Sequence, residues 1–231
     1  MPLTMDLEQA KGATTAFYTL HGCDGDISMA ISRVLELKEQ NKNLAWRDML
    51  GEHPSVVSRL EEQGISNPFE LKDLTWDDSM ILFTCSTHLD EDGKPLPIGE
   101  RLTRERFGRF PWSNGSIIDY LIEFLRPNSN LANSNDSFER ILKLLKKLYS
   151  FNNENDFEVA RYVNGDGGMN ILGFLSFEEV MELRKLMTGR NWSVASDEPL
   201  DGGIRDAIKH LIAMLKSAER RDSGIMHRAH T

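Results

Sequence analysis

The sequence has few cysteines and no long apolar run. Cysteine occurs twice in 231 residues, as Cys23 and Cys85, which excludes a disulfide framework as the source of stability. The longest apolar runs, such as residues 80–83, fall far short of the roughly 20 residues that span a bilayer. The first residues lack the basic and apolar regions of a secretory signal. We therefore expect a cytoplasmic protein with reduced thiols and no membrane partner.

The common motifs of nucleotide, ester and peptide chemistry are also absent. The sequence has no Gly-x-x-x-x-Gly-Lys-Ser/Thr, Gly-x-Gly-x-x-Gly, Gly-x-Ser-x-Gly or His-Glu-x-x-His. Walker-type hydrolysis, Rossmann dinucleotide binding and the usual esterase elbow therefore lose their strongest sequence support. The glycine loops around Gly93 and Gly167 lack the glutamate that an EF-hand needs at position twelve. We predict no cofactor and favour a protein without catalytic activity.

The chain is acidic, and its charge is unevenly distributed. It carries 27 Lys and Arg against 36 Asp and Glu, a net charge of -9. Residues 1–100 contain 8 basic and 18 acidic residues, a net of -10, whereas residues 101–231 contain 19 and 18, a net of +1. This balance argues against binding to nucleic acid or to an anionic membrane surface. It suits a soluble protein, or one whose partner presents a basic face.

An asparagine- and serine-rich stretch divides the sequence into two blocks. Residues 127–135 contain four asparagines, two serines and a proline, which offer little to bury and many ways to turn. We predict an acidic, mostly helical block over 1–126, an exposed linker or loop over 127–135, and an α+β block over 136–231. The pattern leaves open whether the two blocks share one core.

Apolar periodicity predicts an α+β fold that is mainly helical with a few short strands. The expected helices are 27–40 with Asp26 as N-cap, 44–50, 54–63, 116–125, a helix capped by Asp136 and Glu139, a helix capped by Ser176 and Glu179, and 203–221. The expected strands are 159–163 and 169–174, joined by a glycine turn, and a short edge strand at 224–228. Residues 75–87 fit a helix or a buried strand, and Val159 also fits a helix beginning at Asp156.

Charged residues in two neighbouring segments indicate a protein-binding surface. Acidic residues cluster near a predicted loop, and residues 101–112 interleave four arginines with three aromatic residues. Arginine pairs with carboxylate or phosphate and stacks on rings, so a nucleic-acid or nucleotide site is one alternative. In the other alternative, these arginines pair with the acidic loop while the aromatic residues anchor their own loop to a core. The predicted partner-binding residues are Asp77, Asp78, Asp90, Glu91, Asp92, Arg104, Arg106 and Arg109.

A second interpretation is a metal-assisted hydrolase or nucleotide-handling enzyme. Its candidate residues are His21, Asp24, Asp26 and His88, because imidazole and carboxylate groups bind zinc.

Each cysteine lies within three residues of a histidine in the sequence, so Cys23 and Cys85 could complete a zinc site. The spacing fits no standard zinc finger. One alternative is that residues 24–26 form a turn and helix cap while Cys85 packs in the core, and another is a reactive cysteine, which needs an environment that stabilises the thiolate. We favour the first of these alternatives, predict no metal, and expect an interaction protein of the immunity, antitoxin or adaptor type.

Overall fold

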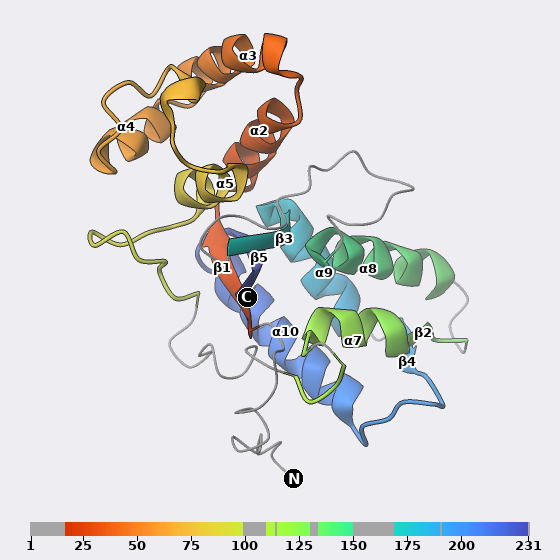
Figure 1. Ribbon diagram of the computed structural model, residues 1–231. Helices are drawn as coiled ribbons and strands as arrows, with labels where there is room; N and C mark the ends of the chain where they lie inside the picture. The colour runs from red at the N-terminus through yellow and green to blue at the C-terminus, as the bar shows by residue number, and fades with distance from the viewer. Residues whose placement is uncertain are drawn as a thin grey trace.

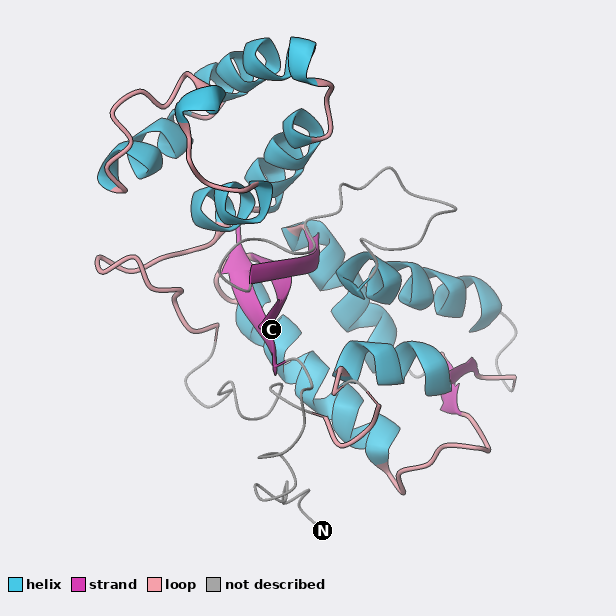
Figure 2. Ribbon diagram, in the orientation of Figure 1, coloured by secondary structure: helices cyan, strands magenta, loops and turns pink. Residues whose placement is uncertain are grey.

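The computed structural model is an α+β fold in which helices predominate, as the sequence predicts (Figures 1 and 2). It describes residues 17–98, 110–113, 115–129, 134–149, 169–189 and 191–230. The helices are α2 (Gly25–Leu35), α3 (Glu39–Glu52), α4 (Pro54–Glu62), the short 3-10 helix η1 (Leu71–Asp73), α5 (Asp78–Ser86), α7 (Ile117–Phe124), α8 (Ser134–Tyr149), α9 (Phe177–Thr188) and α10 (Gly203–Glu219). The strands are β1 (Phe17–Cys23), β2 (Leu125–Pro127), β3 (Met169–Leu175), β4 (Trp192–Val194) and β5 (Gly224–His230). Within these ranges, no helix is long and apolar enough to cross a membrane.

A three-stranded antiparallel sheet with the order β1–β5–β3 joins the two ends of the described chain. Strand β5 pairs along its whole length with β1, from Phe17 opposite His230 to Cys23 opposite Gly224. The expectation that 224–228 forms an edge strand is therefore wrong, because β5 is the central strand. Its first four residues are all buried, since a central strand covered on both faces shows no alternation of buried and exposed positions.

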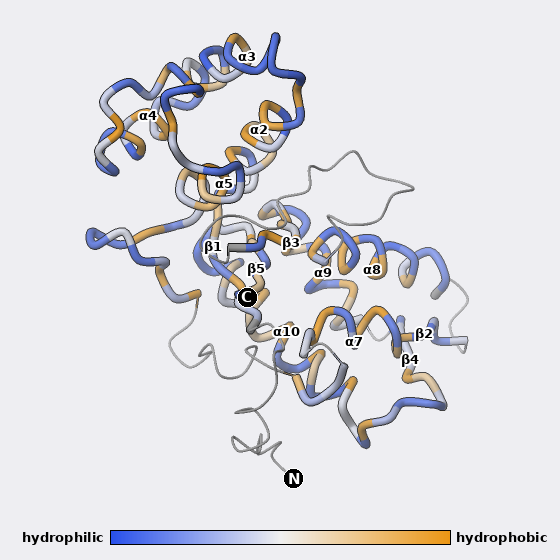
Figure 3. Tube along the Cα trace, in the orientation of Figure 1, coloured by the Kyte–Doolittle hydropathy of each residue, from blue (hydrophilic) through white to orange (hydrophobic). Residues whose placement is uncertain are grey.

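Alternate residues of the sheet contribute to two apolar cores. On one face, Cys23, Phe174 and Met226 pack with helices α2 to α5. On the other face, Leu20 and Ile225 pack with helices α7 to α10. Figure 1 shows the first helical group above the sheet and the second to its right and below it, and Figure 3 shows hydrophobic and hydrophilic residues alternating along α8 and α10. The sheet is thus a partition between two helical layers.

The first helix starts two residues earlier than expected because another acidic residue caps it. The carboxylate of Asp24 accepts hydrogen bonds from the backbone N–H groups of Asp26 and Ile27, each at 3.0 Å. Asp24 has an extended backbone, whereas Asp26 lies in the first turn of α2. The N-cap is Asp24 and not Asp26; an acidic side chain is favourable at either position, so residue type alone does not distinguish them.

The single helix expected over 27–40 is in fact two helices. Helix α2 ends at Leu35, the last buried residue of its apolar face. Residues 36–40 are all exposed, so no buried side chain holds a continuation of α2 against the core. The next helix, α3, contains the expected helix 44–50 and buries Trp46.

Two further N-terminal predictions concern α4 and α5. The helix expected over 54–63 is confirmed as α4, which has Pro54 in its first turn. Residues 75–87, where the sequence fits helix or strand, contain helix α5. The Asp77 carboxylate accepts a hydrogen bond from the Met80 N–H at 2.8 Å, and this N-cap favours the helix.

The asparagine- and serine-rich stretch connects α7 and α8. Pro127 belongs to β2 and Ser134 to α8, while residues 130–133 lie outside the described residues. Because α8 already includes Ser134, Asp136 lies in the first turn of the helix. The capping box expected from Asp136 and Glu139 is therefore wrong, although an acidic residue in the first turn still complements the helix dipole.

Other predictions about the second half of the chain have mixed outcomes. The strand expected at 169–174 is confirmed as β3. Its expected partner strand at 159–163 lies outside the described residues, as does the glycine turn between them. The division into blocks 1–126 and 136–231 stays a prediction.

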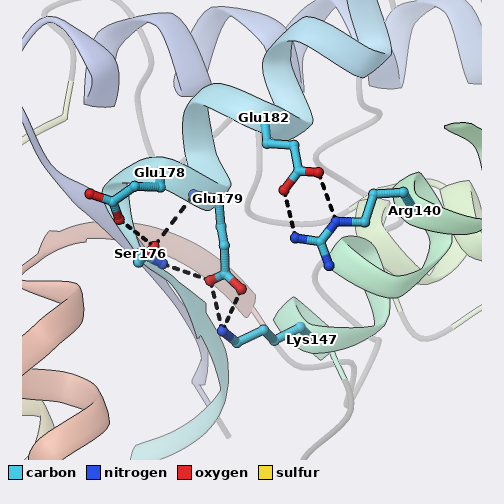
Figure 4. A network of polar contacts seen from close by, with 6 residues as sticks. All are labelled: Arg140, Lys147, Ser176, Glu178, Glu179 and Glu182. Carbon is cyan, nitrogen blue, oxygen red and sulfur yellow. Dashed lines mark hydrogen bonds and ion pairs between the residues drawn. The ribbon is translucent and has the colours of Figure 1, made fainter.

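The capping box expected at the start of α9 is confirmed (Figure 4). The Glu179 N–H donates to the Ser176 hydroxyl at 3.4 Å, and the Glu179 carboxylate accepts from the Ser176 N–H at 2.9 Å. The same carboxylate pairs with Lys147 of α8 at 2.7 Å. Arg140 of α8 binds both carboxylate oxygens of Glu182 on α9, at 2.8 and 2.5 Å. Charge-assisted contacts therefore join α8 to α9 along one side.

Gly173 allows the C-terminal turn of α8 to touch β3. A Cβ at this position would overlap the carbonyl oxygen of Lys147 and lie 2.9 Å from the carbonyl carbon of Leu148. We expect Gly173→Ala to lower the free energy of unfolding by roughly 3 kcal/mol, the upper part of the usual range for overpacking, because the backbone itself must move. Urea denaturation would measure the loss.

Gly51→Ala provides the matched control for this substitution. Gly51 lies in α3, and a Cβ there would meet nothing within 4 Å. Alanine is the better helix former, so we expect this variant to be as stable as the wild type or more stable by up to about 1 kcal/mol. Similar losses in both variants would show that the close contact at Gly173 is not the cause.

Candidate binding groove

The short strands β2 and β4 form one side of the candidate site. They pair antiparallel, with Arg126 opposite Ser193. The Ser193 hydroxyl donates to the carbonyl oxygen of Pro127 at 2.9 Å. The indole N–H of Trp192 donates to the carbonyl oxygen of Met187 in α9 at 2.8 Å. These side-chain bonds attach β4 to β2 on one side and to the end of α9.

Helix α10 forms the other side, and Glu198 fixes its start. The N-cap residue, Gly202, has φ 77° and no side chain to accept a hydrogen bond. Instead, Glu198 Oε1 accepts from the Ile204 N–H at 2.5 Å and from the Tyr120 hydroxyl at 2.9 Å. Burial, together with the neighbouring Glu198, raises the pKa of Tyr120, so its hydroxyl stays a donor. Glu198 therefore links the first turn of α10 to α7.

The groove between these elements has a volume of about 910 Å³, within the range of ligand-binding clefts. From α10 it is lined by Arg205, Ile208, Lys209, Ile212, Ala213 and Lys216, and from the strand side by Asn128, Trp192, Ser193 and Val194. Among these lining residues, three are cationic and none is acidic. The groove thus combines apolar side chains with positive charge.

The cations of the groove differ from those on the neighbouring helices. Between α8 and α9, cations are neutralised by glutamates, as Lys147 is by Glu179 (Figure 4). Arg205, Lys209 and Lys216 are exposed, and no ion pair or hydrogen bond of their side chains occurs within the described ranges. Their charge is available to a ligand.

Two of the predicted partner-binding acids lie at the start of α5. Asp77 is its N-cap, and Asp78 lies 3.6 Å from Lys42 of α3, with 48% of its side chain exposed. Both side chains therefore have a structural contact. Their predicted contact with a partner stays a prediction.

The other three predicted acids lie in the loop after α5. Asp90 Oδ1 accepts from the N–H groups of Asp92 and Lys94, at 3.0 and 2.8 Å, which forms a tight turn. Asp92 pairs with Lys94 at 3.2 Å and remains 74% exposed. Asp90 and Glu91 are exposed too. In Figure 1 this loop projects to the left, whereas β2 and β4 lie to the right, so the loop and the groove are separate surfaces.

The predicted arginines Arg104, Arg106 and Arg109 lie outside the described residues. Two aromatic residues that follow them are described. The rings of Phe110 and Trp112 contact the ring of Tyr120, with centroid distances of 4.7 and 5.3 Å. These two aromatic residues anchor their loop to the core, as one of the sequence interpretations supposes.

His21, a candidate of the enzymatic interpretation, belongs to a buried polar cluster. Its Nε2 lies 2.7 Å from the Thr19 hydroxyl, which also lies 2.8 Å from Nε2 of His230. The His21 ring stands edge-on to the ring of Phe83 at a centroid distance of 5.2 Å. A hydroxyl between two imidazoles can donate to one and accept from the other, so the contact satisfies the Nε2 atom of each ring.

The remaining enzymatic candidates surround the start of α2. Asp24 is its N-cap, and Asp26 lies exposed in the first turn. His88 is half-buried, and burial lowers its pKa. No cluster of three His, Cys, Asp or Glu side chains that could hold a metal occurs among the described residues. The hydrolase interpretation therefore stays a prediction without an assembled site.

Cys23 and Cys85 are both buried free thiols in the core around α2 to α5. Burial raises the pKa of each thiol to about 12. Both are therefore protonated at neutral pH, and the reactive form of cysteine is the thiolate. The prediction that Cys85 packs in the core is confirmed.

Among the residues that the structure describes, none of the partner-binding residues predicted from the sequence lines the groove. Arg205, Lys209 and Lys216 stand at helical spacing on the polar side of the predicted helix 203–221, which is a detectable signal of a cationic stripe. The strand side had no such signal, because β4 is three residues long and its position depends on pairing with β2.

No protein-family model, curated protein or solved structure matches this chain, so the candidate groove is defined by its geometry alone.

Proposed function

We propose that this protein works by binding another protein, and that the groove between β4 and α10 holds a segment of that partner with acidic and apolar side chains. The observation that carries the proposal is the set of three cations, Arg205, Lys209 and Lys216, in a groove whose described lining has no acidic residue. This function belongs to the class of immunity, antitoxin or adaptor proteins.

Charge and apolar surface have different roles in such a site. Opposite charges accelerate encounter and select the partner, and they exclude partners of like charge. Apolar surface removed from water supplies most of the affinity. Trp192, Ile212 and Val194 are partly buried, so each retains surface that a partner can cover. A segment that alternates acidic and apolar residues matches both features.

The polar groups of the groove are better suited to binding than to covalent chemistry. Ser193 is its only hydroxyl among the described lining residues, and that hydroxyl donates to a backbone carbonyl. A nucleophilic serine needs an adjacent base. The described lining includes no histidine, cysteine or carboxylate to act as one.

The acidic loop offers a second contact on a different surface. Asp90, Glu91 and Asp92 are exposed, and the net charge of the first 100 residues is -10. A basic face on the partner would be attracted to this loop, with an association rate that falls as salt screens the charges. The groove would then set the affinity, and the loop would set the rate of encounter.

Charge reversal in the groove tests the proposal. We expect a partner to co-purify with the tagged wild-type chain from its native cell, and its recovery to fall at least tenfold for Lys209→Glu/Lys216→Glu, which corresponds to about 1.4 kcal/mol. Lys143→Glu/Lys146→Glu is the matched control, because both lysines are exposed on α8 and the charge change is the same. Dissociation constants with the purified partner would quantify the difference.

The same purified partner tests the acidic loop. Asp90→Asn/Glu91→Gln/Asp92→Asn should slow association and weaken its salt dependence, with little change in the dissociation rate. Equal recovery and affinity of the groove variant and its control would contradict the groove as the binding site. Unchanged association kinetics of the triple variant would remove the loop from the interface.

A further inference from the structure

We propose that the partner segment binds as an extended strand, added to the free edge of β4 inside the groove. This inference rests on the proposed function and specifies the conformation of the ligand. Strand addition uses backbone hydrogen bonds for affinity and alternate side chains for specificity.

The hydrogen-bond pattern of β4 identifies the free backbone groups. The Ala195 N–H bonds the carbonyl oxygen of Phe124 at 2.9 Å. Because bonded residues alternate along an antiparallel pair, the next residue bonded to β2 is Ser193. The residues between, Trp192 and Val194, therefore direct their N–H and C=O groups away from β2. In the described chain the sheet has these two strands only, so this edge of β4 has no strand partner.

The residues of the free edge also line the groove. Trp192 and Val194 line it together with the cationic face of α10. A segment bound there would remove water from their outward N–H and C=O groups, and a buried backbone group without a hydrogen bond costs about 1–3 kcal/mol. The occupant must therefore supply both donors and acceptors along its backbone.

An extended polypeptide meets this requirement better than the alternatives. A helix uses its backbone groups internally, so it would leave those of β4 unpaired. Phosphate groups of a nucleic acid could pair with the cations, but they have no donor for the outward carbonyl groups. A strand supplies both partners, with an N–H and a C=O on the same side of every second residue.

The spacing of the cations fits acidic side chains on such a strand. Arg205 and Lys209 are four residues apart, or about 6 Å along the helix axis. Side chains on one face of a strand recur every two residues, at about 6.6 Å. From Arg205 to Lys216 the distance along the axis is about 16 Å, the length of about five strand residues. Acidic residues at alternate positions can therefore reach these cations.

Synthetic peptides test the bound conformation on the full chain. The probe is a ten-residue peptide that alternates glutamate and valine, and the controls are a peptide of the same composition in a helical pattern, a lysine–valine peptide and a single-stranded oligonucleotide. We expect only the alternating acidic peptide to bind, and the Lys209→Glu/Lys216→Glu variant to weaken it at least tenfold. N-methylation of alternate residues should weaken binding at least tenfold for one set of positions and leave the other set unchanged.

Amide hydrogen exchange supplies a second readout. Bound peptide should slow exchange at Trp192 and Val194 and leave Ser193 unchanged. Tighter binding of the helical peptide or of the oligonucleotide, or equal effects of both N-methylated sets, would overturn the inference.

Replacing Ala213, which lines the groove, by a photo-crosslinking residue distinguishes a failure of this inference from a failure of the proposed function. If the alternating peptide does not bind while the native partner still crosslinks at position 213, strand addition is overturned and the groove remains the binding site. If the peptide does not bind and no crosslink forms, both proposals fail.

Discussion

Replacing Leu211 or Leu145 by alanine is expected to lower the free energy of unfolding by about 2–5 kcal/mol, the usual cost of truncating a buried leucine. Both side chains are fully buried, Leu211 in the middle of α10 and Leu145 in the C-terminal half of α8. They belong to the same apolar core beneath the sheet. Each truncation removes apolar contacts and leaves a cavity that the surrounding helices fill only in part.

Urea denaturation of the two variants would measure this loss, with Leu44→Ala as the control. Leu44 lies in α3 with 66% of its surface exposed, so its truncation should change stability by less than about 0.5 kcal/mol. Unfolding midpoints of the Leu211 and Leu145 variants that equal those of the wild type would mean that these side chains do not pack in the folded core.

Stability should also fall as the pH falls from about 6.5 to 4, because of His227. Its ring is buried in the sheet, and its Nδ1 lies 2.8 Å from the carbonyl oxygen of Leu148 at the C-terminal end of α8. A carbonyl only accepts, so Nδ1 carries the hydrogen and donates it. Burial lowers the pKa of His227 to about 4, although its hydrogen bond to Leu148 opposes that shift.

The direction of this change in stability follows from which state of the chain, folded or unfolded, binds the proton more readily. In the unfolded chain His227 binds a proton below about pH 6.5, whereas in the folded chain it binds one only below about pH 4. The neutral ring therefore favours the folded state above pH 6.5, and this contribution is lost as the pH falls to 4 and is constant below it. At 1.36 kcal/mol per pKa unit, the loss is roughly 3 kcal/mol.

His227→Asn isolates this contribution from other titrating groups. Asparagine has no charge to gain and keeps an N–H donor for the Leu148 carbonyl. Unfolding free energies at pH 7 and pH 4 should differ less for the variant than for the wild type, by roughly 3 kcal/mol. His88, whose pKa burial also lowers, is present in both proteins and cancels in the comparison. The same pH dependence in both would show that His227 does not carry the effect.

Local signals in the sequence predicted the helices well and their exact ends less well. Ser176 and Glu179 form a capping box whose residue types and spacing are specific, and the prediction is confirmed in detail. Asp24 and Asp26 are two acidic residues in one turn, and only the backbone geometry selects the first as the cap. At α8, the residue types likewise indicated Asp136 as the cap, but the helix already begins at Ser134 and Asp136 lies in its first turn.

Such local signals do not predict which strands pair when they are far apart in the sequence. The central position of β5 depends on its pairing with β1. In this pair, Phe17 lies opposite His230, although the two residues are far apart in the sequence. The groove has the same origin, since Trp192 meets α10 only because β4 pairs with β2. A sequence pattern reports which face of an element is apolar, and it does not report which distant element covers that face.

The central position of β5 also bears on how the chain folds as it is synthesised. Thr19 and its contact His230 are separated by 211 positions in the sequence, which ribosomes translate in roughly 10–40 s at 5–20 residues per second. Throughout that interval β1 exposes an unpaired edge, a site where strands of other molecules can add. Neither helical layer can close on the complete three-stranded sheet until β5 leaves the ribosome. Docking of both layers on the complete sheet is therefore coupled to the synthesis of β5.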